Sequence, residues 1–285
     1  MRVCLKTLRC PRSTQRLCAR LPGPVVLVPT MGALHAGHAS LLTHARKLAG
    51  TSGSVVATVF VNPSQFGPKE DLSRYPRPFS KDQTLCRKAG VDVLFAPEPE
   101  GMYSPDFSTW VEELSVSKDL CGSSRPGHFR GVCTVVLKLF LICRPDIAVF
   151  GQKDFQQCAV IARMTRDLHV PVRLVFAPTV RESDGLALSS RNTYLSTEER
   201  AQAPVLYAAL LEARSAVQRG ETRASQICKI LRRRIAAAPL ARADYVAVVD
   251  SETLQPVRKI SGNTTAAIAV FFGRTRLIDN LCLRH

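Results

Sequence analysis

Apolar runs of strand length alternate with segments of helical spacing through the first two thirds of this chain, and that alternation restricts the fold more than any other feature. Residues 25–28 form a β-branched run between two prolines, and residues 55–61 form a second run that is apolar almost throughout. Strands without polar alternation are typical of parallel sheets, because helices cover both faces of such sheets. The sequence therefore predicts an α/β fold built on a Rossmann-like, doubly wound parallel sheet.

The order of the predicted elements divides the chain into parts. Up to residue 177 strands and helices alternate, with strands expected at 25–28, 55–61, 91–96, 147–150 and 172–177, and helices at 38–48, 80–89, 132–143 and 153–168. After Thr197 come two helices, at 198–219 and 222–237, and then two strands, at 245–249 and 266–271. We therefore expect a basic N-terminal segment at 1–23, a Rossmann-like domain at 24–185 and a smaller α+β domain at 186–285.

The charge of the chain is unusual for a protein of otherwise ordinary composition. Lys and Arg number 39 against 23 Asp and Glu, a net charge of +16, and the first acidic residue is Glu70. Such an excess favours anionic partners, among them nucleic acid, anionic membranes and nucleotide phosphates, but surplus arginine on a solvated surface accounts for it equally well. With 46% hydrophobic and 22% charged residues, a disordered, collagen-like or coiled-coil chain is excluded.

The N-terminal segment and the cysteines bear on the compartment. Residues 1–23 carry six basic residues and no acidic one, which fits either an organelle transit peptide or a short basic amphipathic helix; we favour the helix. The ten cysteines include no CxxC pair and no zinc spacing, which favours a reducing compartment. We predict a cytoplasmic protein, with an organellar location as the alternative. The longest apolar run, 135–143, is too short to span a membrane.

The turn after the first predicted strand contains the residues best suited to bind phosphate. It holds Gly32 and Gly37, which allow a ligand to approach the backbone, and two histidines three residues apart, His35 and His38. The following helix begins with unpaired N–H groups, which attract anions. This arrangement is neither a Walker loop nor a GxGxxG fingerprint. It resembles the HxGH signature of nucleotidyltransferases and class I aminoacyl-tRNA synthetases.

Further motifs make the resemblance more specific. They are FVNPSQFG at 60–67, RPGHF at 125–129, GQKDFQQ at 151–157, PTVRE at 178–182, SSRN at 189–192 and TRLIDN at 275–280. In this order they are similar to the pantothenate synthetase (pantoate–β-alanine ligase) family over about residues 24–285. The resemblance implies an ATP-dependent condensation of pantoate with β-alanine through a pantoyl adenylate, with release of AMP and pyrophosphate. It also implies a homodimer formed through the first domain, and a C-terminal domain that closes over the active site.

The resemblance assigns roles to individual residues. It implies that His38, His35, Lys153 and Arg191 are catalytic, and that Asn62, Gln65 and Gln157 bind pantoate or β-alanine. The ATP-binding residues that it implies are Met31, Gly32, Ala33, Leu34, His35, Ala36, Gly37, His38, Gly151, Gln152, Lys153, Asp154, Val180, Leu188, Ser189, Ser190 and Arg191. Arg125 and His128 are expected to orient the site. ATP is expected as substrate with Mg²⁺, held chiefly by ATP oxygens and water without protein metal ligands.

Two positions depart from the family pattern. Gln152 stands where we expect an acidic residue, which leaves its contact with ATP open. Leu188 replaces the methionine of the family's Met-Ser-Ser-Arg, a change that conserves volume.

Two other functions fit parts of the sequence. A transferase that moves AMP or CMP onto a phosphorylated substrate would share His35, His38 and Arg191, but would not need the neutral amides of Asn62, Gln65 and Gln157. A nucleic-acid binder would interleave basic residues with stacking aromatic residues. Only 6% of the residues are aromatic and Trp110 is the sole tryptophan. We therefore expect small-molecule substrates, and neither nucleic acid nor a membrane as partner.

Overall fold

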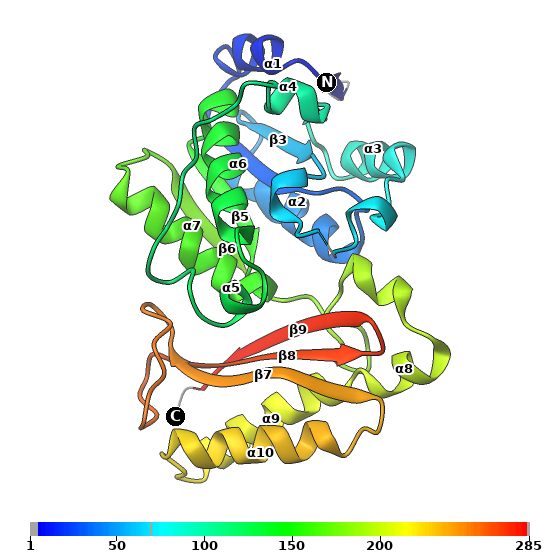
Figure 1. Ribbon diagram of the computed structural model, residues 1–285. Coiled ribbons are helices and arrows are strands. Elements are labelled where there is room, and N and C mark those ends of the chain that lie inside the picture. Colours follow the sequence, from blue (N-terminus) through cyan, green and yellow to red (C-terminus); the bar gives the residue numbers. More distant parts are fainter. Residues whose placement is uncertain (1–4, 69, 284–285) are drawn as a thin grey trace. The chain divides into compact units, whose positions relative to one another are not determined.

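The computed structural model describes residues 5–68 and 70–283, which form two compact units (Figure 1). The first unit contains residues 1–113, Arg125–Gln152 and Val160–Pro178; the second contains Leu114–Ser124, Lys153–Ala159 and residues 179–285. The sequence predicts one boundary at 185/186, whereas the last division falls at 178/179 and two earlier segments join the second unit. Leu114–Ser124 is mostly loop, and Lys153–Ala159 includes the start of a helix. The periodicity of such short segments does not predict which unit they pack against.

A six-stranded parallel sheet forms the centre of the first unit. Its strands are β1 (Lys6–Leu8), β2 (Val25–Thr30), β3 (Ser54–Val59), β4 (Val93–Phe95), β5 (Ile147–Gly151) and β6 (Arg173–Ala177), in the order β1-β4-β3-β2-β5-β6. The chain runs outward from β2 to β3 and β4, and then returns to the other side of β2 to form β5. The strand order therefore reverses between β2 and β5, where a doubly wound sheet offers a crevice for a ligand.

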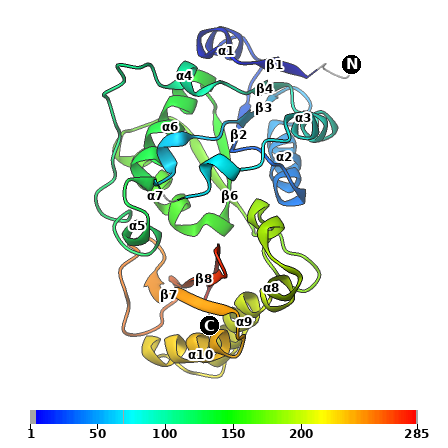
Figure 2. The ribbon, with the colours of Figure 1, turned by 45° about the vertical axis from the view of Figure 1, so that its right-hand side comes forward.

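Helices cover both faces of this sheet. The helices and 3₁₀ turns of the first unit are α1 (Pro11–Cys18), α2 (Ala36–Ala49), η1 (Pro63–Gln65), η2 (Leu72–Arg74), α3 (Phe79–Lys88), α4 (Pro99–Met102) and α6 (His128–Cys143), and η3 (Gln152–Asp154) and α7 (Phe155–Asp167) have residues in both units. Helices α2 and α3 lie on one face and α6 lies on the other (Figure 2). Among residues 5–68 and 70–283, no helix is both long and apolar enough to cross a membrane.

The core under α2 follows from the period-two geometry of the strands. Val26 and Val28 of β2 and Val55 of β3 pack with Leu42 and Ala45 of α2 in one buried cluster. Burial of each such valine or leucine side chain contributes roughly 1.5–3 kcal/mol. Because intervening residues such as Leu27 are buried as well, the strands are apolar on both faces, as the sequence predicts. The predicted α/β fold class is confirmed.

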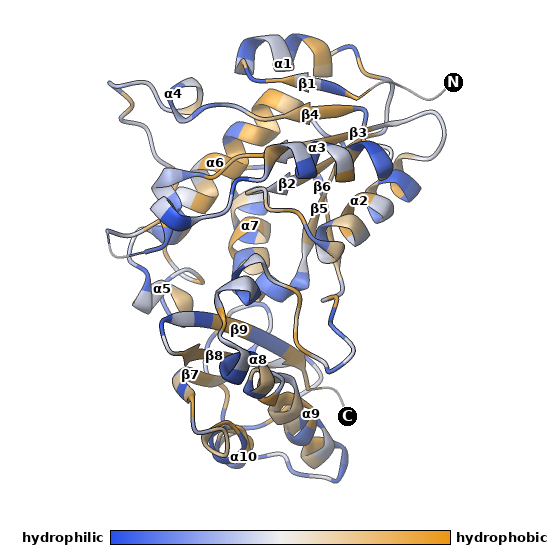
Figure 3. Ribbon diagram, turned by 90° about the vertical axis from the view of Figure 1, so that its right-hand side faces the viewer, coloured by the Kyte–Doolittle hydropathy of each residue, from blue (hydrophilic) through white to orange (hydrophobic). Residues whose placement is uncertain are grey.

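The second unit is an antiparallel sheet with two helices packed on it (Figure 1). Its elements are α5 (Cys121–Ser124), η4 (Ser190–Tyr194), α8 (Thr197–Gln202), α9 (Val205–Gln218), α10 (Ala224–Ala236), β7 (Ala241–Asp250), β8 (Thr264–Phe272) and β9 (Thr275–Cys282), with the strand order β7-β8-β9. Leu206 and Leu210 of α9 and Ile227 and Leu231 of α10 share a core with Ile268 of β8. The apolar colouring of β8 in Figure 3 agrees with its nearly complete burial.

The N-terminal segment is part of the α/β unit. The sequence predicts a helix for it, and α1 forms, but residues 6–8 also form an edge strand that pairs in parallel with β4. Thr14 and Cys18 of α1 are buried, and the helix packs against α6. A strand of three residues is too short to produce a recognisable pattern, so the sequence could not predict it.

Two elements of the second unit also differ from the prediction. The helix predicted at 198–219 is two helices, because Pro204 cannot donate a backbone hydrogen bond and begins α9 as its N-cap. Strand β9 was not predicted as a strand. Its buried positions are Thr275, Leu277 and Asp279. Because Asp279 is a carboxylate, the strand lacks the regular apolar alternation from which a strand is predicted.

Candidate active site

Two of the predicted phosphate-binding segments leave the sheet on either side of the reversal in strand order. The HxGH turn follows β2 directly, and residues 151–154 follow β5, which pairs with β2 through Val26–Ile147 and Leu27–Ala148. The carboxyl ends of parallel strands lie at one edge of a sheet, so both segments begin at the same edge. Asn62 and Gln65 follow β3, the neighbour of β2 on its other side.

The two histidines of the turn cap helix α2. His35 is the N-cap, and its Nδ1 accepts a hydrogen bond from the Gly37 N–H at 3.1 Å, while the His35 N–H donates to Nδ1 of His38 at 3.3 Å. An imidazole nitrogen that accepts carries no proton, so each neutral ring has its proton on Nε2. The ring centroids are 4.1 Å apart. The turn therefore holds two neighbouring Nε2–H donors in a fixed tautomer.

A buried carboxylate holds the backbone of this turn. Asp82 of α3 accepts from the N–H of Ala33 at 3.0 Å and from the N–H of Leu34 at 2.8 Å. Ala33 has φ +51° and Gly32 has φ +83°, conformations that are unfavourable for residues with a Cβ. A Cβ at Gly32 would meet Val59 and Asp82 at about 3.0–3.1 Å, so only glycine fits there without displacement.

The environment of Asp82 opposes its charge. Asp82 is 1% exposed, and burial raises the pKa of its carboxyl, although the hydrogen bonds from Leu34 and Ala33 act in the opposite direction. The nearby Cys86 thiol has its pKa raised to about 12, by burial first and by the Asp82 charge second. The Asp82 carboxyl therefore satisfies two backbone donors of a turn that we expect to bind phosphate, at a position where burial disfavours a negative charge.

The two predicted amides lie within hydrogen-bonding distance of each other. Asn62 caps η1 by accepting from the Ser64 N–H, and its Nδ2 donates to Oε1 of Gln65 at 3.0 Å. Both side chains are buried. Helix α6 approaches η1 closely, since a Cβ at Gly131 would overlap the Ser64 carbonyl.

The expected orienting pair is also next to Gln65. His128 Nδ1 lies 2.8 Å from the backbone oxygen of Gln65, and Arg125 donates to the same oxygen at 3.2 Å. Arg125 also makes a two-pronged ion pair with Glu70, at 2.7 and 2.5 Å. The prediction that Arg125 and His128 orient the site remains a prediction, but their contacts are those of residues that fix a neighbour.

The segment after β5 is divided between the two units: Gly151 and Gln152 belong to the first, and Lys153, Asp154 and Gln157 to the second. Lys153 Nζ lies 3.5 Å from Asp154 Oδ1, and both side chains retain access to solvent. The backbone oxygen of Lys153 accepts from Nδ2 of Asn280 on β9 at 3.0 Å. The C-terminal strand therefore fixes the backbone from which Lys153 extends.

A hairpin-like loop in the second unit brings together the remaining predicted ATP residues. The Leu188 N–H donates to the Val180 oxygen at 3.0 Å, and Ser189 caps η4 by accepting from the Arg191 N–H. Arg181 within the same loop donates to Asp279 of β9 through both terminal nitrogens, at 2.6 and 2.9 Å. Strand β9 thus anchors this loop as well as the backbone at Lys153.

The comparisons with known proteins agree with one another. The family model for pantoate-beta-alanine ligase matches residues 5–282. A pantothenate synthetase of Oleidesulfovibrio alaskensis is 50% identical over 287 residues, which cover 98% of this chain and 100% of the relative. The chain belongs to the pantoate-beta-alanine ligase family.

Solved structures of the ligase family match the fold. A crystal structure of the Thermus thermophilus pantothenate synthetase has a TM-score of 0.92 at 46% identity, covering 98% of this chain and 100% of that one. A ligase from Francisella tularensis, complexed with beta-gamma ATP and beta-alanine, has a TM-score of 0.79 at 29% identity and covers 98% of each chain.

The predicted ligase residues are assembled within each unit. The first unit contains the HxGH turn, the amide pair and the end of β5, whereas the second contains Lys153, Asp154, Gln157 and the loop from Val180 to Arg191. The ligand contacts of these residues remain predictions. Sequence reasoning missed Asp82, which is one of many acidic residues near a helix start, and Gln156, whose buried amide donates to the oxygens of Val116 and Asp119.

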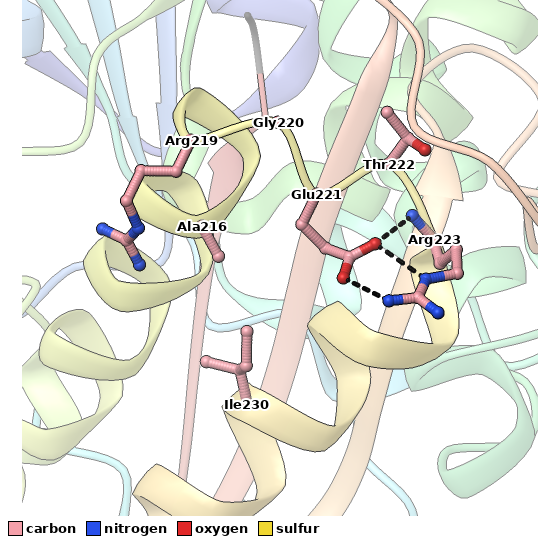
Figure 4. A pocket seen from close by; sticks show the side chains of 7 residues that line it. All are labelled: Ala216, Arg219, Gly220, Glu221, Thr222, Arg223 and Ile230. Atoms are coloured by element: carbon pink, nitrogen blue, oxygen red, sulfur yellow. Dashed lines mark hydrogen bonds and ion pairs between the residues drawn. The ribbon is translucent and has the colours of Figure 1, made fainter.

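A surface hollow in the second unit is not part of this set. It has a volume of about 530 Å³ and is lined by Ala216, Arg219, Gly220, Glu221, Thr222, Arg223 and Ile230 (Figure 4). The Glu221 carboxylate is paired with Arg223, which lowers the pKa of Glu221 to about 2. None of the predicted ligase residues lines this hollow.

The raised pKa of Asp82 predicts a pH-dependent difference in stability. A carboxyl whose pKa is higher in the folded chain binds its proton more tightly there, so protonation favours folding. We expect the free energy of unfolding of the wild type, relative to the Asp82→Asn variant, to rise as pH falls from 7 through the raised pKa toward the ordinary value of about 3.9. Urea unfolding of both proteins along this pH series measures the difference.

Asp106→Asn is the control, because local hydrogen bonds, first that from Ser104, lower the pKa of Asp106. Its pH trend should have the opposite sign. A difference between the wild type and Asp82→Asn that is constant with pH would contradict the prediction.

Proposed function

We propose that this chain catalyses the ATP-dependent condensation of pantoate with β-alanine to pantothenate. A carboxylate oxygen of pantoate bonds to the α-phosphorus of ATP while the bond to the bridging oxygen of the β-phosphate breaks, which yields pantoyl adenylate and pyrophosphate. The β-alanine amine then attacks the acyl carbon, loses a proton, and AMP leaves. The observation that carries this proposal is the position of the HxGH turn and of residues 151–154 after β2 and β5, at the reversal in strand order.

ATP is proposed to bind through backbone and cationic groups. The turn from Met31 to His38 and the N-terminus of α2 offer N–H donors to the phosphates. In the second unit, Val180 is proposed to contact adenine through its backbone. Further ATP contacts are proposed for Gly151, Gln152, Lys153, Asp154, Leu188, Ser189, Ser190 and Arg191.

Pantoate is proposed to bind at Gln65 and Gln157, beside Asn62. Amides suit a hydroxy acid because they offer donors and acceptors without adding charge. The neighbouring Gln156 supports a role for Gln157, since its buried amide is fully used inside the protein and leaves the half-buried Gln157 as the amide at the start of α7 that can meet a ligand.

Rate enhancement is proposed to come from alignment and electrostatics. As the α-phosphorus is attacked, negative charge grows on the phosphate oxygens and on the departing pyrophosphate. The Nε2–H groups of His35 and His38 are held toward their ligands by the capping of α2, which occupies both Nδ1 atoms. Lys153 supplies a mobile point charge, and Arg191 supplies two parallel donors.

Mg²⁺ is proposed to enter with ATP as part of the substrate. Within the described ranges, no group of three or more His, Cys, Asp or Glu side chains is placed to hold a metal ion. Mg²⁺ readily keeps phosphate and water ligands in place of a protein cage. The ion would offset the phosphate charge during the first step.

A cytoplasmic location with a retained N-terminal segment is the compartment that we propose. Cleavage near residue 23 would remove β1 from the edge of the sheet and expose the surface that α1 covers. The nine cysteines that the structure describes are free thiols, which agrees with a reducing environment. Mass spectrometry of the native protein's N-terminus tests this: a start near residue 24 would contradict it and favour the organellar alternative.

We propose a homodimer formed through the first domain. Apolar side chains remain exposed on the first unit, including Trp110 and Leu141, and a partner chain would cover them. Light scattering during gel filtration should give twice the 31.3 kDa of one chain at micromolar concentration. A single-chain mass over that range would contradict the dimer.

The reaction itself is tested by incubating the protein with ATP, Mg²⁺, pantoate and β-alanine. We expect AMP, pyrophosphate and pantothenate in equal amounts, and a pantoyl adenylate when β-alanine is omitted. ATP turnover that does not require pantoate would contradict the proposed function. Transfer of AMP or CMP to a phosphorylated substrate would instead support the transferase that shares the HxGH turn.

Two substitutions test the proposed phosphate contacts. His38→Ala should slow adenylate formation by at least about 10²-fold, because it removes a donor to the developing charge. Lys153→Ala should weaken ATP binding and slow the same step by about 10²-fold. Single-turnover rates of pyrophosphate release measure both effects. The exposed residues His169 and Lys229 supply matched alanine controls, and a near-normal rate for His38→Ala would remove that residue from the mechanism.

A further inference from the structure

The orientation of the Asn62 carboxamide is fixed by two backbone groups. The Ser64 N–H donates to Oδ1 of Asn62 at 3.3 Å, and Nδ2 of Asn62 donates to the Gly131 carbonyl at 3.2 Å. A backbone N–H can only donate and a carbonyl can only accept, so the oxygen and nitrogen ends of Asn62 cannot be exchanged. The second hydrogen on Nδ2 is donated to Gln65 Oε1 at 3.0 Å.

This contact determines which end of Gln65 is available. Because Oε1 of Gln65 accepts from Asn62, the Nε2 end carries the two remaining N–H donors. None of the described residues accepts a hydrogen bond from that nitrogen, although Gln65 is only 7% exposed. This nitrogen is not among the fully buried side-chain atoms that lack a partner, so it retains some exposure and can meet an acceptor supplied by a ligand or water.

Asn62 itself has no donor left for a ligand. Both Nδ2 hydrogens are used, Oδ1 also accepts from the Ser64 hydroxyl at 2.9 Å, and the residue is 1% exposed. We propose that Asn62 is a positioning residue, which holds the Gln65 carboxamide with its N–H groups toward the organic acid and does not contact that acid. The inference rests on the proposed function and differs from the family resemblance, which implies that Asn62 binds the substrate.

A second clamp acts on the backbone of Gln65. Arg125 can only donate, so the contact of 3.0 Å between its Nη1 and Nε2 of His128 makes Nε2 the acceptor. The proton of the neutral His128 ring therefore lies on Nδ1, which donates to the Gln65 oxygen at 2.8 Å. Glu70 holds Arg125 through two hydrogen bonds. His128 and Arg125 are thus positioning residues for Gln65 as well.

The fixed amide gives the site a chemical preference. Two N–H donors match carboxylate and hydroxyl oxygens; pantoate carries both kinds, whereas β-alanine carries only the carboxylate and an ammonium group that these donors repel. If the Gln65 carboxamide were reversed, its oxygen would face the ligand and disfavour a carboxylate. The orientation imposed by Asn62 therefore contributes to selection of an oxygen-rich acid at this position.

Asn62→Asp tests this orientation. At alkaline pH the new carboxylate has no donor for Gln65 Oε1, so the Gln65 carboxamide should reverse. We expect KM for pantoate to rise at least about tenfold while KM for ATP changes less than about twofold. At lower pH the protonated carboxyl regains an O–H donor. The ratio of the variant's KM for pantoate to that of the wild type at the same pH should therefore fall toward one. Asn62→Ala frees Gln65 without reversing it and should raise KM for pantoate less.

The backbone clamp supplies an independent pair of variants. His128→Asn keeps an N–H near the position of Nδ1 and should retain a KM for pantoate close to that of the wild type, whereas His128→Ala should raise it severalfold. The control substitutions are Asn263→Asp and His169→Asn, on exposed positions of the second and first units. Thermal unfolding reports whether each variant is folded, and the His128 pair decides the matter if Asn62→Asp does not fold.

The outcomes separate this inference from the proposed function. A wild type that forms no pantothenate overturns the proposed function. If the wild type is active, the inference is overturned when KM for pantoate and KM for ATP rise together, when Asn62→Asp binds pantoate normally at alkaline pH, or when His128→Asn and His128→Ala are equally impaired. A pantoate-specific, pH-reversible defect in Asn62→Asp supports it.

Discussion

Parallel pairing between β2 and β5 is the constraint on which the candidate site depends. The pairing joins Val26 to Ile147 and so brings together strands from distant parts of the sequence. A strand that pairs in parallel needs a crossover connection, and here the crossovers on the two sides of β2 lead away in opposite directions. The turns that follow β2 and β5 therefore leave the sheet where a doubly wound fold typically offers a crevice for a ligand. In the first unit, the HxGH turn and residues 151–152 occupy those two turns.

The HxGH turn is unfavourable as isolated backbone. Ala33 in the left-handed region is strained by about 1–2 kcal/mol, and a buried carboxylate such as Asp82 is unfavourable without partners. Together, the two features compensate each other. The left-handed turn directs the Ala33 and Leu34 N–H groups inward, and the carboxylate accepts both of them. Met31 to His38 are then held in one conformation before any ligand arrives, which reduces the ordering required on binding.

Periodicity and composition were sufficient to predict the central strands of the parallel sheet. They did not predict its edge strand β1, or strand β9 of the second unit. Apolar runs such as 25–28 are specified locally, because both faces of each strand are buried. Strand β1 depends on pairing with β4 for its existence, and β9 contains the buried Asp279, whose role is apparent only beside Arg181. For the candidate site, the motifs indicated residues whose roles remain predictions. They could not identify Asp82 or Glu70, since each supports the site through a contact distant in sequence.

In the proposed mechanism, the first unit supplies the neutral amides Asn62 and Gln65, and the second unit supplies the cations Lys153 and Arg191. Phosphate binding calls for cationic side chains that can move. Lys153 and Arg191 have long cationic side chains on backbones that are fixed, that of Lys153 by Asn280 and that of Arg191 by the Ser189 cap. The acid must approach a polyanion, so a cation close to its carboxylate would stabilise the ground state as strongly as the transition state. A neutral amide orients the carboxylate without neutralising it and leaves its oxygen nucleophilic. Arg125, which donates to the Gln65 backbone oxygen, is half-buried and paired with the half-buried Glu70, so the two charges offset each other beside Gln65. The net charge of +16 is thus a property of the chain as a whole, whereas the proposed mechanism depends on neutral side chains where the acid is expected to bind.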